Sequence, residues 1–180
     1  MRKPPSPPPE RFDREVALLY FAHRNMAAVA DGPLVRLGMG RAHHRALFFV
    51  GRRPGMAVKE LQTILSITYQ GLHRVLSDLM AAELLEQEPD SSDKRRRHLI
   101  LTPAGAALDA ECAALQAELL RSAFAAAGHG AAFGDVLEAM MTPQDRGAAA
   151  TLDLSAERSK TDQAGNTGAR LSKKAASPSR

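Results

Sequence analysis

The sequence predicts a mainly α-helical protein with one small β-hairpin. Only 4% of the 180 residues are aromatic, and the apolar content is largely Ala and Leu, which favour helices. Apolar residues recur at helical spacing in residues 12–154, except for two strand-like runs between residues 84 and 101. We therefore expect a single domain over residues 12–154. A disordered Pro-rich segment at 1–11 and a disordered basic tail at 155–180 should flank it.

Composition argues against several broad classes of protein. The chain has one cysteine, so no disulfide framework or cysteine-based metal cluster is expected. No apolar run is long enough to span a membrane, and the first ten residues, MRKPPSPPPE, lack the apolar core of a signal peptide. We expect a soluble protein in a reducing, cytoplasmic setting, with no membrane partner.

Positive charge is concentrated in the middle of the chain. Residues 36–98 hold eleven Lys/Arg against seven Asp/Glu, whereas residues 99–154 hold two against seven. A local basic segment indicates a polyanion as the partner of that segment. Chance asymmetry of a solvated surface would give the same counts, so the charges alone leave both interpretations open.

The first part of the domain predicts two helices. Apolar residues fall at helical spacing over residues 12–30, and Asp31-Gly32-Pro33 is expected to stop that helix. A second helix is expected over Arg41–Val50, between two glycines. Arg52–Gly55 reads RRPG, which is typical of a turn.

Two further helices follow closely. The first is expected over Val58–Leu65, and Thr68 can cap the second, which runs to about Ala82. The second helix is amphipathic, with an apolar face formed by Leu72, Val75, Leu76 and Leu79. Its other face carries hydrogen-bonding side chains, namely Tyr69, Gln70, His73, Arg74 and Ser77.

A β-hairpin with a basic tip comes next. Its strands are expected over Leu84–Glu88 and His98–Leu101, joined by a long polar loop. The loop ends in four consecutive cations, Lys94 to Arg97, which repel each other and add nothing to a core. Such a run needs a source of compensating negative charge.

A long helix completes the pattern. Thr102 can cap it, and Pro103 suits its first turn. Its apolar repeat consists of Leu108, Cys112, Leu115, Leu119 and Ala123. Gly128-His129-Gly130 breaks the helix, and shorter helices are expected over Phe133–Met141 and from Thr142 to about Leu154.

Two short helices followed by a hairpin are the order of a winged helix-turn-helix, which we assign to residues 37–102. The second helix of such a motif enters the major groove of DNA, where Gln, Arg, Ser, Thr and His side chains can contact base edges. A basic hairpin beside it can place an arginine in the negative minor groove, so the cations find their counter-charge on DNA. The candidate DNA-binding residues are Thr68, Tyr69, Gln70, His73, Arg74, Ser77, Lys94, Arg95, Arg96 and Arg97. Asp90 and Asp93 can pair with the arginines and stabilise the wing.

The wing and the start of the following helix carry a composite motif. It consists of Asp90, Asp93, Lys94 and Arg95, followed by Leu101, Thr102 and Gly105. This spacing resembles the D-x-x-D-K/R-R and L-T-x-x-G signature of the MarR family of bacterial transcription regulators. The resemblance covers about residues 12–154 and is strongest over 50–105.

The resemblance implies a homodimeric regulator, expected to be a repressor, that binds double-stranded DNA at a pseudo-palindromic operator. The dimerisation helices would be residues 12–30 and 103–154, and Arg95 matches the arginine that the family places in the minor groove. Family members also hold small aromatic acids between the dimer stalk and the DNA-binding lobes. Candidate residues for such an effector site are Tyr20, His23, Arg24, His44 and Phe48. Their helical spacing predicts core packing equally well.

Two other classes of function remain as alternatives. A winged helix without a DNA-binding role could bind protein or RNA, although an acidic wing would suit a protein partner better than this basic one. An enzyme is not indicated, because the chain lacks a Gly-rich phosphate loop, a catalytic Ser/His/Asp arrangement and a metal-ligand cluster. We therefore expect no catalytic residue, no metal and no cofactor. Cys112 lies on an apolar helix face, which favours packing over redox sensing.

Overall fold

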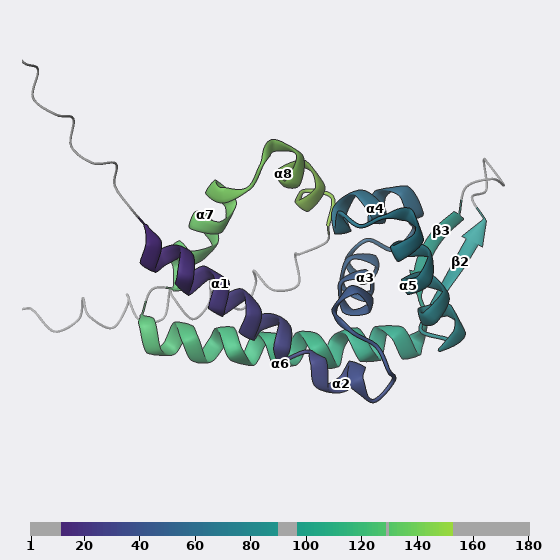
Figure 1. Cartoon of the computed structure of the whole chain (residues 1–180), viewed down its shortest axis with the longest axis horizontal. Coiled ribbons are helices and arrows are strands. Elements are labelled where there is room, and N and C mark those ends of the chain that lie inside the picture. Colours follow the sequence, from purple (N-terminus) through teal and green to yellow (C-terminus); the bar gives the residue numbers. More distant parts are fainter. Residues whose placement is uncertain (1–11, 90–96, 129, 153–180) are drawn as a thin grey trace, which may run out of the picture.

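Helix α6 (Pro103–Ala127) runs along most of the molecule and carries a lobe at one end (Figure 1). The computed structural model describes residues 12–89, 97–128 and 130–152. The lobe consists of a small sheet and three helices, α3 (Arg41–Arg52), α4 (Val58–Leu65) and α5 (Tyr69–Ala81). The bounds of α4 are those predicted from the sequence, and those of α5 differ by one residue at its end. The predicted mainly α-helical class is confirmed.

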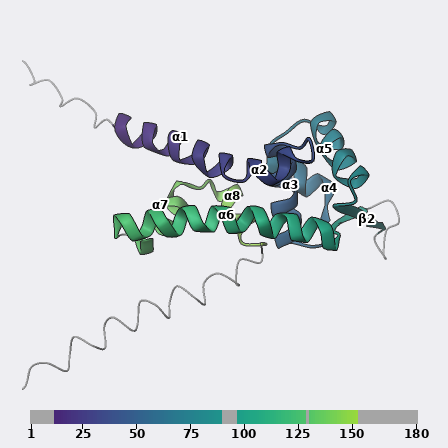
Figure 2. The same cartoon turned by 90° about the horizontal axis from the view of Figure 1, so that it is seen from below.

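The remaining helices lie mainly to one side of the lobe. Helix α1 (Asp13–Ala28) extends from the lobe to the same side as α6 in both views (Figure 2). Helix α2 (Asp31–Val35) joins α1 to the lobe. After α6, helices α7 (Gly130–Met140) and α8 (Pro143–Ala149) lead back toward the lobe (Figure 1). The segments expected to be disordered, 1–11 and 155–180, lie outside the described residues.

The sheet of the lobe has three antiparallel strands in the order β1 (Met56–Ala57), β3 (Arg97–Leu101), β2 (Leu85–Pro89). Strands β2 and β3 form the predicted hairpin, with Leu85 opposite Leu101. Strand β1 was not predicted, because two residues are too few to show the alternation of a strand. It forms through a long-range pairing of Met56 with Leu99.

One hydrophobic core joins the lobe to α2 and α6. Its fully buried members include Leu34, Leu47, Leu61, Leu72, Leu79, Leu99 and Cys112. Each helix of the lobe contributes apolar residues at helical spacing, so the amphipathic pattern alone determines which face turns inward. The core therefore fixes the orientation of α5 relative to α3 and to the sheet.

Cys112 occupies the packing position that the sequence predicted. The residue is fully buried, and its Sγ lies 3.8 Å from the carbonyl oxygen of Ala30. Burial raises the pKa of the thiol to about 11, with Asp109 and Glu111 adding to the effect. A thiol that stays protonated at neutral pH is a poor nucleophile, which fits a structural role.

Threonine caps set the starts of two long helices. Thr68 Oγ1 accepts the N–H of Gly71 at 3.1 Å, and Thr102 Oγ1 accepts the N–H of Gly105 at 3.0 Å. Gly105 is needed for a further reason. A Cβ at this position would lie 1.9 Å from the carbonyl oxygen of Leu84, so the start of α6 approaches the β2 end of the lobe too closely for any side chain.

Several helix boundaries differ from the sequence-based expectation. Helix α7 begins at Gly130, a residue expected to break the helix, rather than at Phe133. Asp31-Gly32-Pro33 does not only end a helix but also begins α2, because proline is tolerated in a first turn, where N–H groups lack partners. Helix α3 continues past Val50 to Arg52, whose Nη1 donates to the carbonyl oxygen of Phe48 at 3.0 Å. The last helix ends at Ala149 rather than near Leu154.

The segment after α8 returns to the lobe. Arg53 Nη1 donates to Thr151 Oγ1 at 3.2 Å, and Leu152 packs against the core. The end of the described chain is thus attached to the turn that precedes α4. Within the described ranges, no helix has the length and apolar character needed to cross a membrane.

Candidate nucleic-acid interface

Helices α4 and α5 form the helix-turn-helix of the lobe. The chain turns between them at Ser66, which has a φ of 51° in the left-handed region. All four residues predicted for the apolar face of α5 are buried, namely Leu72, Val75, Leu76 and Leu79. The hydrogen-bonding residues of α5 are consequently held at the surface of the lobe.

A groove of about 1230 Å³ lies between α4, α5 and the sheet. The polar lining from α5 consists of Tyr69, His73 and Ser77, which lie on one helix face because they are spaced by four residues. Leu72, Leu76 and Met80 of the same helix add apolar lining. The rings of Tyr69 and His73 are 6.3 Å apart, and Ser77 Oγ lies 3.5 Å from His73 Nδ1. Arg97 of β3 and Lys59 of α4 bring positive charge to the walls.

Gln70 and Arg74 form a second surface on α5. Both side chains are exposed, and neither lines the groove. Within the part of the chain that the structure describes, neither side chain has a hydrogen-bond or ion-pair partner. Thr68 is also exposed, but its hydroxyl is used as the helix cap. The six residues predicted on this helix therefore divide into a groove-facing set, an outward-facing pair and a cap.

The wing is described only at its base. Arg97 is the first residue of β3, is exposed and pairs across the hairpin with Pro89. The other predicted wing residues, Asp90, Asp93, Lys94, Arg95 and Arg96, lie outside the described residues. Their expected roles stay predictions.

Lys59 is a residue of this surface that the sequence analysis missed. It is exposed on α4 and lines the groove opposite α5. Arg53 lines the same groove, but its Nη2 lies 3.0 Å from Glu60 Oε1, so its charge is compensated. Glu60 also accepts the backbone N–H of Ala57 at 3.0 Å and thereby caps α4. The sequence signal for Lys59 was a lysine on the first helix of the motif. In the sequence its neighbour Glu60 offsets this charge, but the structure shows Glu60 bound to Arg53 and Ala57.

The five residues predicted to line an effector site form two separate groups. Tyr20, His23 and Arg24 are exposed on α1, where the Arg24 guanidinium lies 5.0 Å from the centre of the Phe21 ring. His44 and Phe48 lie on α3, with ring centres 6.4 Å apart. Among the described residues, no hydrogen bond or ring contact joins one group to the other.

His44 is buried beside charged side chains. Its side chain is buried, and Nε2 has no hydrogen-bond partner among the described residues. Burial lowers the pKa of this imidazole below its ordinary value of 6.5, and the Asp109 carboxylate opposes that shift in part. Close by, Arg52 Nη1 lies 2.9 Å from Asp109 Oδ2, and its guanidinium covers the Phe48 ring at 3.6 Å.

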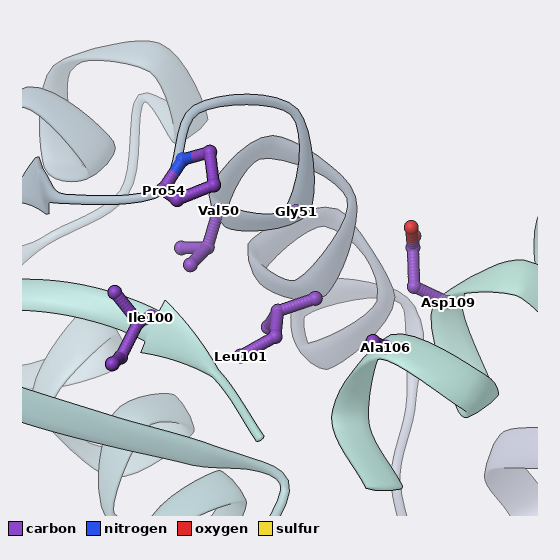
Figure 3. A pocket seen from close by; sticks show the side chains of 7 residues that line it. All are labelled: Val50, Gly51, Pro54, Ile100, Leu101, Ala106 and Asp109. Carbon is purple, nitrogen blue, oxygen red and sulfur yellow. The ribbon is translucent and has the colours of Figure 1, made fainter. Parts of the chain in front are cut away.

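A second hollow, of about 250 Å³, lies where α3, β3 and α6 meet (Figure 3). Its lining consists of Val50, Gly51, Pro54, Ile100, Leu101, Ala106 and Asp109. None of the five effector candidates is among these residues. At Gly51 a Cβ would lie 3.0 Å from Leu101 Cδ1, so the glycine lets α3 approach β3 closely. Asp109, at the edge of the hollow, is already paired with Arg52.

The fold and this surface together define a winged helix-turn-helix protein. The model that describes the MarR family matches residues 37–96. The chain is also 42% identical, over 139 residues, to the HTH-type transcriptional regulator PetP of Rhodobacter capsulatus, covering 76% of this chain and 84% of that protein. The chain therefore belongs to the MarR family of transcriptional regulators.

Solved structures of the family share the fold. A MarR transcriptional regulator from Methanosarcina mazei superimposes with a TM-score of 0.61 at 16% identity, covering 73% of this chain and 89% of that one. A mutant MarR from E. coli, complexed with operator DNA, gives a TM-score of 0.56 at 21% identity, covering 74% of this chain and all of that one. The helices outside the lobe are part of this similarity, because the matched share exceeds the lobe.

Proposed function

We propose that the protein is a sequence-specific DNA-binding repressor that acts as a homodimer on a pseudo-palindromic operator. The observation that carries this proposal is the outward-facing pair Gln70 and Arg74 on a capped helix. Beside it lies a groove with the cations Lys59 and Arg97, neither of which has an ion-pair partner among the described residues. Free donors on a rigid helix suit the reading of base edges, and cations in the adjoining groove suit phosphates. The operator complex of the E. coli MarR mutant supports the same mode of binding.

Within this proposal each set of residues has its own task. Gln70 and Arg74 contact base edges in the major groove, while Tyr69, His73 and Ser77 contact the DNA backbone at the groove. Thr68 contacts the backbone at the helix start, where its hydroxyl keeps its own proton to donate. Lys59 and Arg97 bind phosphates. Lys94, Arg95 and Arg96 extend the contact to the minor groove, with Arg95 inserted and Asp90 and Asp93 stabilising the wing.

The exposed apolar surface supports a dimer. Helix α1 leaves Val16, Leu18, Leu19, Tyr20 and Phe21 between 43% and 66% exposed. Helices α6 and α7 add Leu115, Phe133, Val136 and Met140. Apolar surface of this extent on helices outside the lobe is expected to be buried against a second copy, and a two-fold dimer presents two recognition helices to DNA.

Selection from a random DNA pool with the purified protein tests the proposal. We expect the selected sequences to contain an inverted repeat whose half-sites lie about one helical turn apart. An RNA pool and random DNA of the same length serve as competitors. Selected DNA without an inverted repeat, or RNA that competes as well as the selected DNA, would overturn the proposal and favour a different winged-helix function.

Repression and effector response belong to the same proposal. A reporter gene placed behind the selected operator should be expressed more strongly when the gene for this protein is deleted. We also propose that a small aromatic acid weakens the operator complex by binding near His44 and Phe48. Titration of the complex with benzoate-type acids checks this, and unchanged DNA affinity for all of them would contradict it.

A further inference from the structure

His43 connects the start of α3 to the recognition helix α5. Its Nδ1 accepts the backbone N–H of Gly40 at 3.1 Å, so in neutral imidazole this nitrogen carries no proton. The proton then sits on Nε2, which lies 3.1 Å from Asp78 Oδ2. The backbone of the α3 cap thus fixes the tautomer and directs an N–H donor at the Asp78 carboxylate.

The contact is sheltered on the His43 side. The His43 side chain is 15% exposed and the Asp78 side chain 46% exposed. The two residues are 35 positions apart and belong to helices that pack against each other through the core. The imidazole is therefore held in place by packing, while the carboxylate lies near the surface that α5 presents.

Asp78 lies on the same helix face as the outward-facing pair. Gln70, Arg74 and Asp78 are spaced by four residues, which places them one above another on α5. Opposite charges at this spacing attract each other and can form an ion pair on a helix surface, although the order with the base before the acid is the weaker one. Here Asp78 is bound by His43, and Arg74 has no ion-pair partner within the described part of the chain.

This choice of partner has a consequence for DNA binding. An Arg74 that pairs with Asp78 would lose part of the charge and the donors that it offers to DNA. A carboxylate released on this face would also repel the phosphates. Holding Asp78 from the side of α3 avoids the first effect. A neutral imidazole leaves the carboxylate its negative charge, but the hydrogen bond keeps that charge beside α3.

We propose that His43 is a positioning residue for DNA recognition, which holds Asp78 away from Arg74 and so keeps Arg74 available to DNA. The inference rests on the proposed function of α5 as the recognition helix. A positioning role differs from simple anchoring of α5 in its effect on operator binding. If the contact only anchors the helix, loss of Asp78 weakens operator binding as much as loss of the His43 donor does. If the contact restrains Asp78, removal of Asp78 from a variant that lacks the donor restores operator binding.

Two substitutions separate the two hydrogen bonds of His43. In His43→Gln the amide nitrogen takes the place of Nε2, so the donor to Asp78 is kept and the acceptor for Gly40 is lost. In His43→Asn the amide oxygen takes the place of Nδ1, so the Gly40 bond is kept and Asp78 is released. We expect His43→Asn to weaken operator binding about two- to fivefold. His43→Gln should bind within about twofold of the wild type.

Removal of Asp78 supplies the rescue. We expect Asp78→Ala to bind the operator at least as tightly as the wild type, and the double variant His43→Asn/Asp78→Ala to match Asp78→Ala. Arg74→Ala should weaken binding in the wild-type and Asp78→Ala backgrounds. It should weaken binding less in His43→Asn, where Arg74 is already engaged by Asp78.

A matched control removes a different contact at the start of α3. Asp31→Asn breaks the pair between Asp31 Oδ2 and Arg41 Nη2, 3.4 Å apart, which does not involve α5. Its operator affinity should equal that of the wild type. Urea unfolding of every variant, followed by circular dichroism, shows whether an affinity change merely reflects partial unfolding.

The outcomes distinguish the inference from the function on which it rests. A wild-type protein that prefers no DNA sequence over random DNA would overturn the proposed function. A wild type that prefers its operator, with His43→Asn binding equally well, would overturn the inference alone. So would an Asp78→Ala variant as weak as His43→Asn with no rescue in the double variant, because that result identifies an anchor.

Discussion

At the scale of single residues, we expect His44 to make the stability of the protein depend on pH. Its folded-state pKa lies below 6.5 because burial disfavours the charged imidazole. The unfolded chain therefore binds the proton first as the pH falls, and the stability contributed by neutral His44 is complete above about pH 6.5. That stability is lost between 6.5 and the lowered value. We expect a loss of at most about 1.4 kcal/mol per pH unit in urea unfolding.

The substitution that tests this prediction replaces the buried imidazole by an uncharged side chain, and an exposed histidine serves as the control. His44→Leu should remove most of the decline in the free energy of unfolding between pH 7.5 and 5.5. His73→Leu changes an exposed histidine and should leave the decline intact. An equal decline in both variants would assign the pH dependence to other groups.

Substitution by alanine should change the free energy of unfolding in opposite directions at two helix glycines, one on α6 and one on α7. Gly105→Ala brings a Cβ to 1.9 Å from the Leu84 carbonyl oxygen, so backbone must move, at a cost of about 1–3 kcal/mol in unfolding free energy. Gly134→Ala on α7 meets nothing within 4 Å and should stabilise the protein by about 0.5–1 kcal/mol. Thermal or urea unfolding measures both. A neutral Gly105→Ala would mean that the close approach of α6 to Leu84 is absent in solution.

At the scale of elements, α5 and α4 should contribute differently to DNA binding. Gln70→Ala removes an outward-facing amide and should relax the base preference at one or two operator positions by about 1–3 kcal/mol. Lys59→Ala removes a groove cation on α4 and should weaken binding to all sequences alike, lowering the salt slope by about 1 for each half-site, and so by about 2 for the dimer. Titrations against single-base operator variants at two salt concentrations separate the two effects. The assignment fails if Lys59→Ala changes base preference and Gln70→Ala does not.

The sequence predicted the elements of the lobe well where the signals are local. Thr68 and Thr102 predict helix starts because each caps its helix by accepting the N–H of the residue three positions later. The apolar face of α5 follows from the spacing of its apolar residues alone. Strand β1 and the contact of His43 with Asp78 could not be predicted, because each depends on residues that the fold brings together from 35 or more positions apart. The division of the polar residues of α5 into two sets also needed the position of the sheet.

At the scale of the whole molecule, the exposed apolar face of α1 should control assembly. Leu19→Glu places a charge on this face and should shift the protein toward monomer at micromolar concentration in light scattering. Ala81→Glu adds a charge at an exposed position of α5, outside the helices proposed to dimerise, and should leave the dimer intact. Operator affinity should fall with the dimer, because one recognition helix then binds one half-site. A monomeric wild type would contradict the homodimer directly.

The bond between Arg53 and Thr151 joins residues 98 positions apart, and Leu152 packs on the same lobe. During translation Arg53 leaves the ribosome well before Thr151 is made. At ordinary elongation rates the interval is roughly 5–20 s. Throughout that time the nascent helix-turn-helix lacks this contact with the end of the described chain. The lobe therefore has its own buried residues to fold around before Leu152 is made, and the contacts of Thr151 and Leu152 are added last.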